Sequence, residues 1–380
     1  MGRWLTHYRG DEILPASWIQ SDRDLEAAVA EFGSRIAVDT EFMRTNTYFP
    51  KPGLYQIATG ERVYLIDPQA ICSWQPLIDV FQDPHVTKIM HACQEDLELI
   101  FHHLGTTLRG VFDTQYAHAF VSEDFSLSYV NLVGRRLGVT LEQHETRSNW
   151  LQRPLTDQQI SYAVEDVAYL ESLFQSLRDA LQQEALPGVD KWSWFQHDMV
   201  QREHYQPTQP DAYYLGVKKA WQLDEIALTR LKRLCAWRER TAQVENVPRN
   251  RVVWDDHLYD FARRSRLSMS DIQGRVPRIV AQKYGDALLA VSRGEDEDAL
   301  IPEPVPGPLT SAQGALVKVL RQAGLAIAQH NTMAPELISR KKDLEFCVRH
   351  FSEHGKLSNF YSTWRQDVVG ETYLKILGDA

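Results

Sequence analysis

The chain has 380 residues, of which 43% are hydrophobic, and it carries a net charge of −10. This length exceeds one ordinary domain, so we expect two or three domains with sizeable cores. No apolar run reaches the roughly 18 to 20 residues of a membrane span, and the first residues lack the hydrophobic region of a signal peptide. Four scattered cysteines without C-x-x-C spacing favour reduced thiols over a zinc site or disulfides. We therefore expect a cytoplasmic protein with no membrane partner, and a monomer by default.

The charge is unevenly distributed along the chain. Residues 1–210 contain 16 basic and 29 acidic side chains, whereas residues 211–294 contain 16 basic and 10 acidic ones. Such a distribution suits a chain whose acidic part holds metal ions while a separate basic module meets a polyanion.

The first part of the chain reads as a mixture of strands and helices. Two short strands around a turn at Gly60 follow a buried strand, so the sheet is expected to be antiparallel or mixed. Strands and helices then alternate, which predicts an α/β domain over residues 1–205. The expected strands are 36–42, 54–59, 63–67, 87–92 and 108–112, and the expected helices are 22–32, 94–104, 113–120, 126–137 and one long helix over 156–183.

The second part reads as helix alone. A first helical domain is expected over 211–293, followed by an acidic, proline-punctuated linker over 294–308 and a second helical domain over 309–377. The pair Ala242-Gln243 recurs as Ala328-Gln329, which is one sign of a diverged repeat. From such recurring pairs alone, a diverged repeat and a chance similarity between two helical bundles are equally good explanations.

The buried strand 36–42 ends with two acids, Asp39 and Glu41. Residues i and i+2 of a strand point to the same face, so these carboxylates can converge on one point. Two anions held so close need a cation between them or a proton on one of them. For an isolated pair of this kind, a solvated strand end is the more ordinary interpretation.

Two further acids favour a functional site over a solvated strand end. Asp96 opens a helix, where a carboxylate is favoured in any case, and Asp166 lies one helical turn after Tyr162. Four convergent carboxylates meet the need of phosphodiester hydrolysis by two divalent ions, and hard oxygen ligands favour Mg²⁺ or Mn²⁺ over zinc. Tyr162 could place its hydroxyl on the attacking water.

These residues resemble the motifs of a known superfamily. Asp39-Thr40-Glu41-Phe42, His91 with Glu95-Asp96, and Tyr162-x-x-x-Asp166 resemble the three exonuclease motifs of the DEDD superfamily, and the tyrosine points to its DEDDy branch. The tract 39–50, with 65–68 and 153–155, is similar to the bacterial ribonuclease D family. The helical segments resemble the HRDC modules (helicase and RNase D C-terminal) of that family. The resemblance implies an RNase H-like mixed-sheet exonuclease domain followed by two all-α HRDC-type domains.

The resemblance also implies an activity and roles for individual residues. It implies a 3′→5′ exoribonuclease that trims RNA 3′ ends, precursor tRNA among them, and releases nucleoside 5′-monophosphates. Asp39, Glu41 and Asp166 would hold the metal ion on the nucleophile side, with Asp39 bridging to a second ion held by Asp96. Tyr162 would orient the attacking water. Contacts to the terminal nucleotide would come from Thr40, Phe42 and His91, although a lone histidine on a strand is more often a core residue.

The basic helical domain supplies candidates for contacts to RNA phosphates, for which a solvated helix face is the alternative explanation. They are Lys218, Lys219, Arg230, Lys232, Arg233, Arg249, Arg251, Arg263 and Arg264. Two other functions stay open from the residues alone. One is a 3′→5′ exonuclease that acts on DNA, and the other is an inactive adaptor that binds nucleic acid without shortening it.

Overall fold

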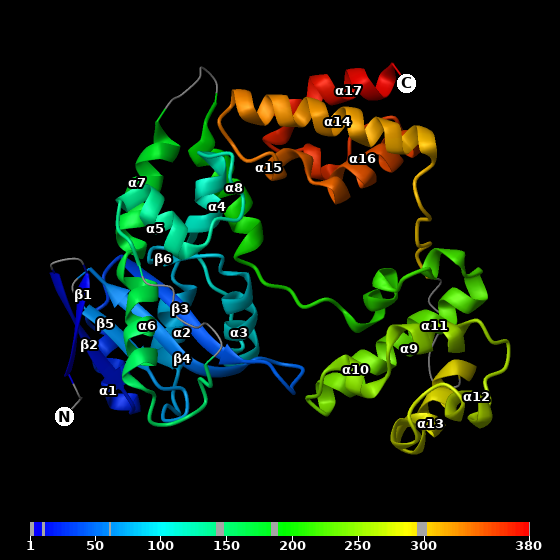
Figure 1. The fold of residues 1–380 in the computed structure, drawn as a ribbon, viewed down its shortest axis with the longest axis horizontal. Coiled ribbons are helices and arrows are strands. Elements are labelled where there is room, and N and C mark those ends of the chain that lie inside the picture. The colour runs from blue at the N-terminus through cyan, green and yellow to red at the C-terminus, as the bar shows by residue number, and fades with distance from the viewer. Residues whose placement is uncertain are drawn as a thin grey trace. The chain divides into compact units, whose positions relative to one another are not determined.

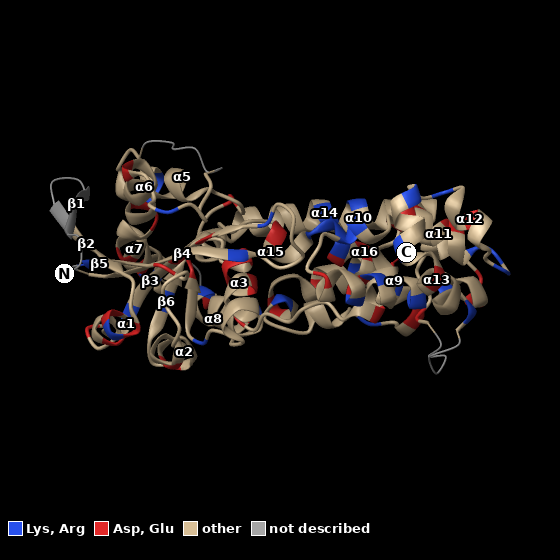
Figure 2. Cartoon of the chain, turned by 90° about the horizontal axis from the view of Figure 1, so that it is seen from below, with Lys and Arg blue, Asp and Glu red and all other residues tan. Residues whose placement is uncertain are grey.

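The computed structural model describes residues 4–9, 12–60, 62–141, 148–183, 189–294 and 302–379 (Figure 1). The chain forms two compact units, whose basic and acidic residues are marked in Figure 2. The first unit comprises Met1–Met43, Pro52–Tyr205 and Leu309–Ala380, and the second comprises Arg44–Lys51 and Gln206–Pro308. Within the described ranges, no helix is both long and apolar enough to cross a membrane. Part of the expected linker, 295–301, lies outside the described residues.

A seven-stranded sheet forms the centre of the first unit, in the order β1-β2-β5-β4-β3-β6-β7. The sheet is mixed, as expected: β4 and β5 are antiparallel, while β3, β6 and β7 are parallel neighbours. The strands are β1 (Trp4–Arg9), β2 (Glu12–Ile19), β3 (Arg35–Met43), β4 (Lys51–Thr59), β5 (Arg62–Ile66), β6 (Thr87–Met90) and β7 (Val111–Asp113).

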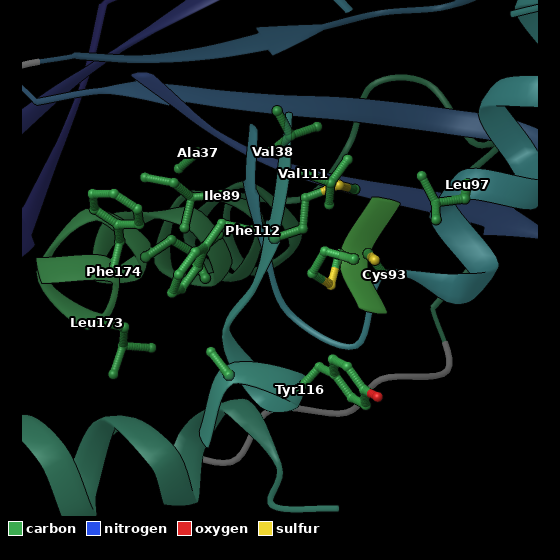
Figure 3. Packing of buried hydrophobic residues seen from close by; sticks show 14 of the residues in the cluster. Ala37, Val38, Ile89, Cys93, Leu97, Val111, Phe112, Tyr116, Leu173 and Phe174 are labelled. Atoms are coloured by element: carbon green, nitrogen blue, oxygen red, sulfur yellow. The ribbon is translucent and has the colours of Figure 1, made fainter. Parts of the chain in front are cut away.

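Helices cover this sheet and enclose an apolar core. Figure 3 shows Val38 of β3, Ile89 of β6 and Phe112 of β7 packing with Leu173 and Phe174 of the helical layer. All five side chains are buried. The core therefore holds β3 in place up to the point where its two acids begin. The helices are α1 (Asp22–Val29), α2 (Gln75–Gln82), α3 (Gln94–Leu104), α4 (Thr114–Phe120), α5 (Tyr129–Leu137), α6 (Asp157–Ala168), α7 (Leu170–Gln182) and α8 (Lys191–Arg202).

The structure differs from the sequence-based expectations at several places in this unit, and two of its helices, α2 and α8, were not expected. Strands β1 and β2 were not expected, yet β2 pairs in parallel with β5 and extends the sheet. The long helix expected over 156–183 is two helices, α6 and α7, separated at Tyr169. The backbone N–H of Tyr169 donates to the hydroxyl of Tyr129 at 3.2 Å, a contact with a residue 40 positions earlier.

The second unit is helical and includes the loop between β3 and β4. Its elements are η1 (Pro210–Gly216), η2 (Ala220–Gln222), α9 (Glu225–Val244), α10 (Arg249–Val252), α11 (Asp255–Ala262), α12 (Met269–Gln273) and α13 (Arg278–Arg293). Tyr48 of the loop is buried in the core of this unit with residues such as Leu231 and Phe261. The loop is therefore an integral part of the helical unit.

A bundle of C-terminal helices packs onto α4 and α8 within the first unit. It consists of α14 (Ser311–His330), α15 (Glu336–Ser339), α16 (Lys341–His354), η3 (Asn359–Tyr361), η4 (Gln366–Gly370) and α17 (Glu371–Gly378). The N–H of Ala334 donates to the carbonyl oxygen of Ala119 at 2.7 Å. Asp198 of α8 accepts from Trp364 at 3.0 Å and from Arg365 at 2.6 Å. Polar contacts thus join this bundle to the sheet domain.

Candidate active site

Three carboxylates meet where β3 and α6 approach each other. Asp39 and Glu41 on β3 and Asp166 on α6 each offer an oxygen, and these oxygens all lie within 4.8 Å of one another. The alternation of side chains along β3 places Asp39 and Glu41 on one face. The third carboxylate arrives from a helix that Thr156 caps, with a capping box to Gln159. This is the kind of acidic cluster that holds a divalent cation.

Asp96 lies beside this cluster, in the first turn of α3, and its side chain is buried. The hydroxyl of Thr40 donates a short hydrogen bond to Asp96. Thr40 lies between the two β3 acids in sequence, so one strand positions three acids, two directly and one through a hydroxyl. The charge of Asp39 raises the pKa of Asp96, after the larger effect of burial.

The site holds more negative charge than its surroundings balance. Among the described residues, none of the four acids forms an ion pair with an arginine, lysine or histidine. Burial, followed by the charge of Asp39, raises the pKa of Glu41 to about 10. Burial likewise raises the pKa of Asp166 to about 8, and the pKa of Asp39 lies well above its usual range because of burial and the Asp166 charge. Such a cluster needs bound protons or a bound cation to be stable.

Tyr162 lies one turn before Asp166 on α6, and its hydroxyl hydrogen-bonds to that carboxylate. Burial and the neighbouring acids raise the pKa of Tyr162, so its hydroxyl keeps its proton. The ring of Trp150 lies 6.0 Å from that of Tyr162, centroid to centroid. A cavity of about 240 Å³ adjoins both rings and is also lined by Gln152 and Gln159. The tyrosine thus keeps its proton beside Asp166 and next to an open space.

The three residues expected to contact a terminal nucleotide have different surroundings. Thr40 is buried with its hydroxyl on Asp96, whereas Phe42 is half-buried against the core. Both ring nitrogens of His91 are occupied, by the Thr114 hydroxyl at 2.9 Å and the Leu127 carbonyl at 3.2 Å. These contacts show a structural role for His91, and a role in substrate binding stays a prediction.

Three of the expected basic residues share a cavity. Arg230, Arg233 and Arg264 line a cavity of about 530 Å³ in the second unit, together with Arg266 and Arg293, which the sequence analysis missed. The run Arg263-Arg264-Ser265-Arg266 was a signal for the first of these two. No acidic residue lines this arginine cavity within the described chain.

The other basic candidates are scattered over the helical unit. Lys218, Lys219 and Arg251 are exposed. The remaining three lie over tyrosine rings: Lys232 over Tyr214, Arg249 over Tyr213 and Arg263 over Tyr259. Such contacts fix the direction of a cationic side chain without neutralising its charge.

Comparison with known proteins agrees with this architecture. A family model described as 3′-5′ exonuclease matches residues 16–182, and the HRDC domain model matches residues 227–291. Ribonuclease D of Pseudomonas paraeruginosa is 36% identical over 374 residues, which cover 96% of this chain and 98% of the relative. Ribonuclease D of Escherichia coli is 29% identical, with 90% of this chain and 92% of the relative covered.

Comparison with solved structures leads to the same family. The crystal structure of Escherichia coli RNase D superimposes with a TM-score of 0.84 and 28% identity, covering 95% of this chain and 98% of that one. The catalytic core of RRP6 from Trypanosoma brucei shares the fold, with a TM-score of 0.57 and 20% identity. By sequence and fold, this chain belongs to the ribonuclease D family and is an enzyme of the 3′→5′ exoribonuclease type.

Proposed function

We propose that the enzyme shortens RNA one nucleotide at a time from the 3′ end and releases nucleoside 5′-monophosphates, with two divalent ions at its acidic cluster. The convergence of Asp39, Glu41 and Asp166 within 4.8 Å carries this proposal. Phosphodiester hydrolysis by two metal ions needs acidic ligands from different elements, and here they come from β3, α3 and α6. Precursor tRNA is the substrate class that we propose.

The residues present fit a divalent metal site. All four acids offer hard oxygen ligands, and no cysteine or histidine belongs to the described cluster, which favours Mg²⁺ or Mn²⁺. When bound, such ions would lower the pKa of water and stabilise charge on the leaving oxygen. Asp39, Glu41 and Asp166 would hold the ion on the nucleophile side. Asp39 would also face a second ion held by Asp96.

Other side chains of the site would orient the reactants. The protonated hydroxyl of Tyr162 hydrogen-bonds to Asp166, so its oxygen can accept a hydrogen bond from a water and position it as it approaches the scissile phosphate. Thr40 would keep Asp96 in place through its hydroxyl. Thr40, Phe42 and His91 stay the proposed contacts to the terminal nucleotide.

Arginines of the helical unit would hold the RNA away from the reacting phosphate. The arginine cavity supports this role best, because Arg230, Arg233 and Arg264 there are joined by two further arginines and no acid belongs to its described lining. Arg264 also pairs with Asp271 at 2.8 Å, outside that lining. Each phosphate contact makes the affinity for RNA depend on salt, with a slope of about 0.7 per contact for single strands. We propose this role for part of the basic set only.

We further propose that residues 1–205 form the exonuclease domain, 211–293 the first HRDC domain and 309–377 a second, diverged one. The match of the HRDC model to residues 227–291 supports the first of these. We also propose that the enzyme is a monomer.

The test compares matched RNA and DNA oligonucleotides that carry the same 3′ tail, incubated with Mn²⁺ or Mg²⁺, and identifies products by mass spectrometry. Release of ribonucleoside 5′-monophosphates with slower release from DNA is the expected outcome. Faster digestion of DNA would favour an exonuclease that acts on DNA. Binding of RNA without any product would favour the inactive adaptor.

A further inference from the structure

A second cavity of the helical unit, of about 430 Å³, is formed by the loop between β3 and β4 together with α9, α10 and the start of α11. The residues of interest in its lining are Arg44, Thr45, Arg249, Asn250 and Trp254. We call it the Trp254 cavity. It shares no lining residue with the arginine cavity.

The walls of the Trp254 cavity are fixed by contacts between the loop and the helices. The side-chain oxygen of Asn246 accepts hydrogen bonds from the backbone N–H groups of Tyr48, at 3.0 Å, and Phe49, at 3.1 Å. The hydroxyl of Tyr48 donates to the buried carboxylate of Glu239 at 3.1 Å. A ligand would therefore enter a preformed space and would not have to order the loop.

The charges around the cavity leave it cationic. Arg238 pairs with the buried Glu239 at 2.8 Å and with Asp255, and Arg249 lies 3.5 Å from the same Glu239. Three arginines, Arg44, Arg238 and Arg249, line the cavity, and Asp255 is the one acidic residue of its described lining. The Arg249 side chain is 45% exposed, and its guanidinium lies 4.5 Å from the Tyr213 ring centre, held in place as a cation. With Arg44 also in its lining, the open part of the cavity favours an anionic group such as a phosphate.

Trp254 gives the cavity a feature that the arginine cavity lacks. Its side chain is 57% exposed, and among the described residues it has no ring, cation or hydrogen-bond partner. The Asn250 amide and the Thr45 hydroxyl, which also line the cavity, likewise have no partner in the described chain. An open indole face beside unused polar groups matches the way in which proteins hold single-stranded nucleic acid, with a base stacked on an aromatic ring.

We propose that the Trp254 cavity is a subsite for one nucleotide of single-stranded RNA, whose base stacks on Trp254 and whose phosphate pairs with Arg249. Asn250 and Thr45 would hydrogen-bond to the ribose or the base edge. This inference rests on the proposed function, because it assigns part of the same RNA substrate. Stacking is tolerant of sequence, so the subsite would accept any base.

The experiment measures binding of a short single-stranded RNA, fluorescent at its 5′ end, to the full-length protein in EDTA, where no digestion occurs. Trp254→Ala should raise Kd about 10-fold, and Trp254→Phe should restore most of the affinity. Trp221→Ala is the matched control, since Trp221 is 44% exposed in the same unit but lies outside the cavity. Arg249→Gln should flatten the dependence of log Kd on log salt by about 0.7, whereas Trp254→Ala should leave that slope unchanged.

Digestion assays with metal separate this inference from the proposed function. In the expected result, Trp254→Ala raises KM for single-stranded RNA without lowering kcat. Trp254→Ala binding RNA as tightly as wild type would overturn the subsite, even if the wild type digests RNA. A wild type that binds RNA through Trp254 but never shortens it would overturn the proposed function and leave the subsite intact.

Discussion

The hydroxyl of Tyr129 donates a hydrogen bond to the carbonyl oxygen of Glu165 at 2.9 Å, and the same hydroxyl accepts from the N–H of Tyr169. These two partners flank Asp166 on the last turn of α6. One side chain of α5 thereby fixes both the end of the helix and the direction of the acid that follows Glu165. Removing a contact that orients a metal ligand typically costs about 10- to 100-fold in metal affinity.

Replacing Tyr129 by Phe should therefore weaken metal activation of the enzyme. The variant keeps the ring but loses both hydrogen bonds, and we expect about a 10-fold higher Mn²⁺ concentration for half-maximal activity. Calorimetric titration of Mn²⁺ without RNA should show the same change. Tyr116→Phe is the control, because it removes another buried hydroxyl, bonded to Asp198 at 2.6 Å, far along the chain from the acids. A Tyr129→Phe variant with unchanged Mn²⁺ affinity would show that the contact is structural only.

Asp39→Asn should keep the stability of the metal-free protein but weaken the binding of metal. In the metal-free protein the substitution removes one of several repelling charges, so we expect an unfolding temperature equal to or above that of wild type. Added Mn²⁺ should stabilise wild type by about 2.7 kcal/mol at 100 times its Kd, and the variant far less. Asp157→Asn, at an exposed acid in the first turn of α6, serves as the control. An Asp39→Asn protein with a full Mn²⁺ response would place the metal elsewhere.

His118 should make the stability of the fold depend on pH. It is buried on α4, its Nδ1 accepts from Arg136 at 3.4 Å, and burial and then the arginine lower its pKa to about 4. Between this value and the ordinary histidine pKa of about 6.5, the unfolded chain binds more protons than the folded one. The free energy of unfolding should therefore fall as pH is lowered from 6.5 to 4.

The measurement is urea unfolding between pH 4 and 7 for wild type and His118→Asn. We expect the variant to be less stable at pH 7 and to lose less stability on acidification. His85→Asn, at a surface histidine, should follow the wild-type curve. If the free energy of unfolding depended on pH equally in wild type and His118→Asn, His118 would not be the cause of that dependence.

Asp198 should be a main anchor of the C-terminal bundle. Asp198→Asn would leave the buried guanidinium of Arg365 without its anion, and breaking a buried pair in this way costs about 3–5 kcal/mol. Thermal unfolding followed by tryptophan fluorescence should show the loss. Glu171→Gln, which removes the partly exposed partner of the exposed Arg35 side chain, should cost less than about 1 kcal/mol. Similar losses for both variants would contradict an anchoring role.

Local patterns in the sequence predicted much of this fold. The helix ending before Gly105, the strand carrying Asp39 and the cap at Thr156 all follow from rules that act within a few residues. The i, i+2 spacing of Asp39 and Glu41 likewise predicted the side on which the two acids meet.

Several of the features that were missed depend on contacts between distant residues. The break at Tyr169 is fixed by Tyr129, 40 positions earlier, so the local helical pattern continues across it. Strand β2 is part of the sheet because it pairs with β5, and Arg293 joins Arg230 only when two helices pack. Periodicity contains no information about such long-range partners.

The most direct test of the central claim follows an RNA labelled at its 5′ end and carrying a single-stranded 3′ tail, with Mn²⁺ present. We expect a ladder that shortens one nucleotide at a time. EDTA or Asp39→Ala should abolish it, and Tyr162→Phe should slow it by about 100-fold. Shortening of the RNA by the Asp39→Ala protein at the wild-type rate would contradict the central claim.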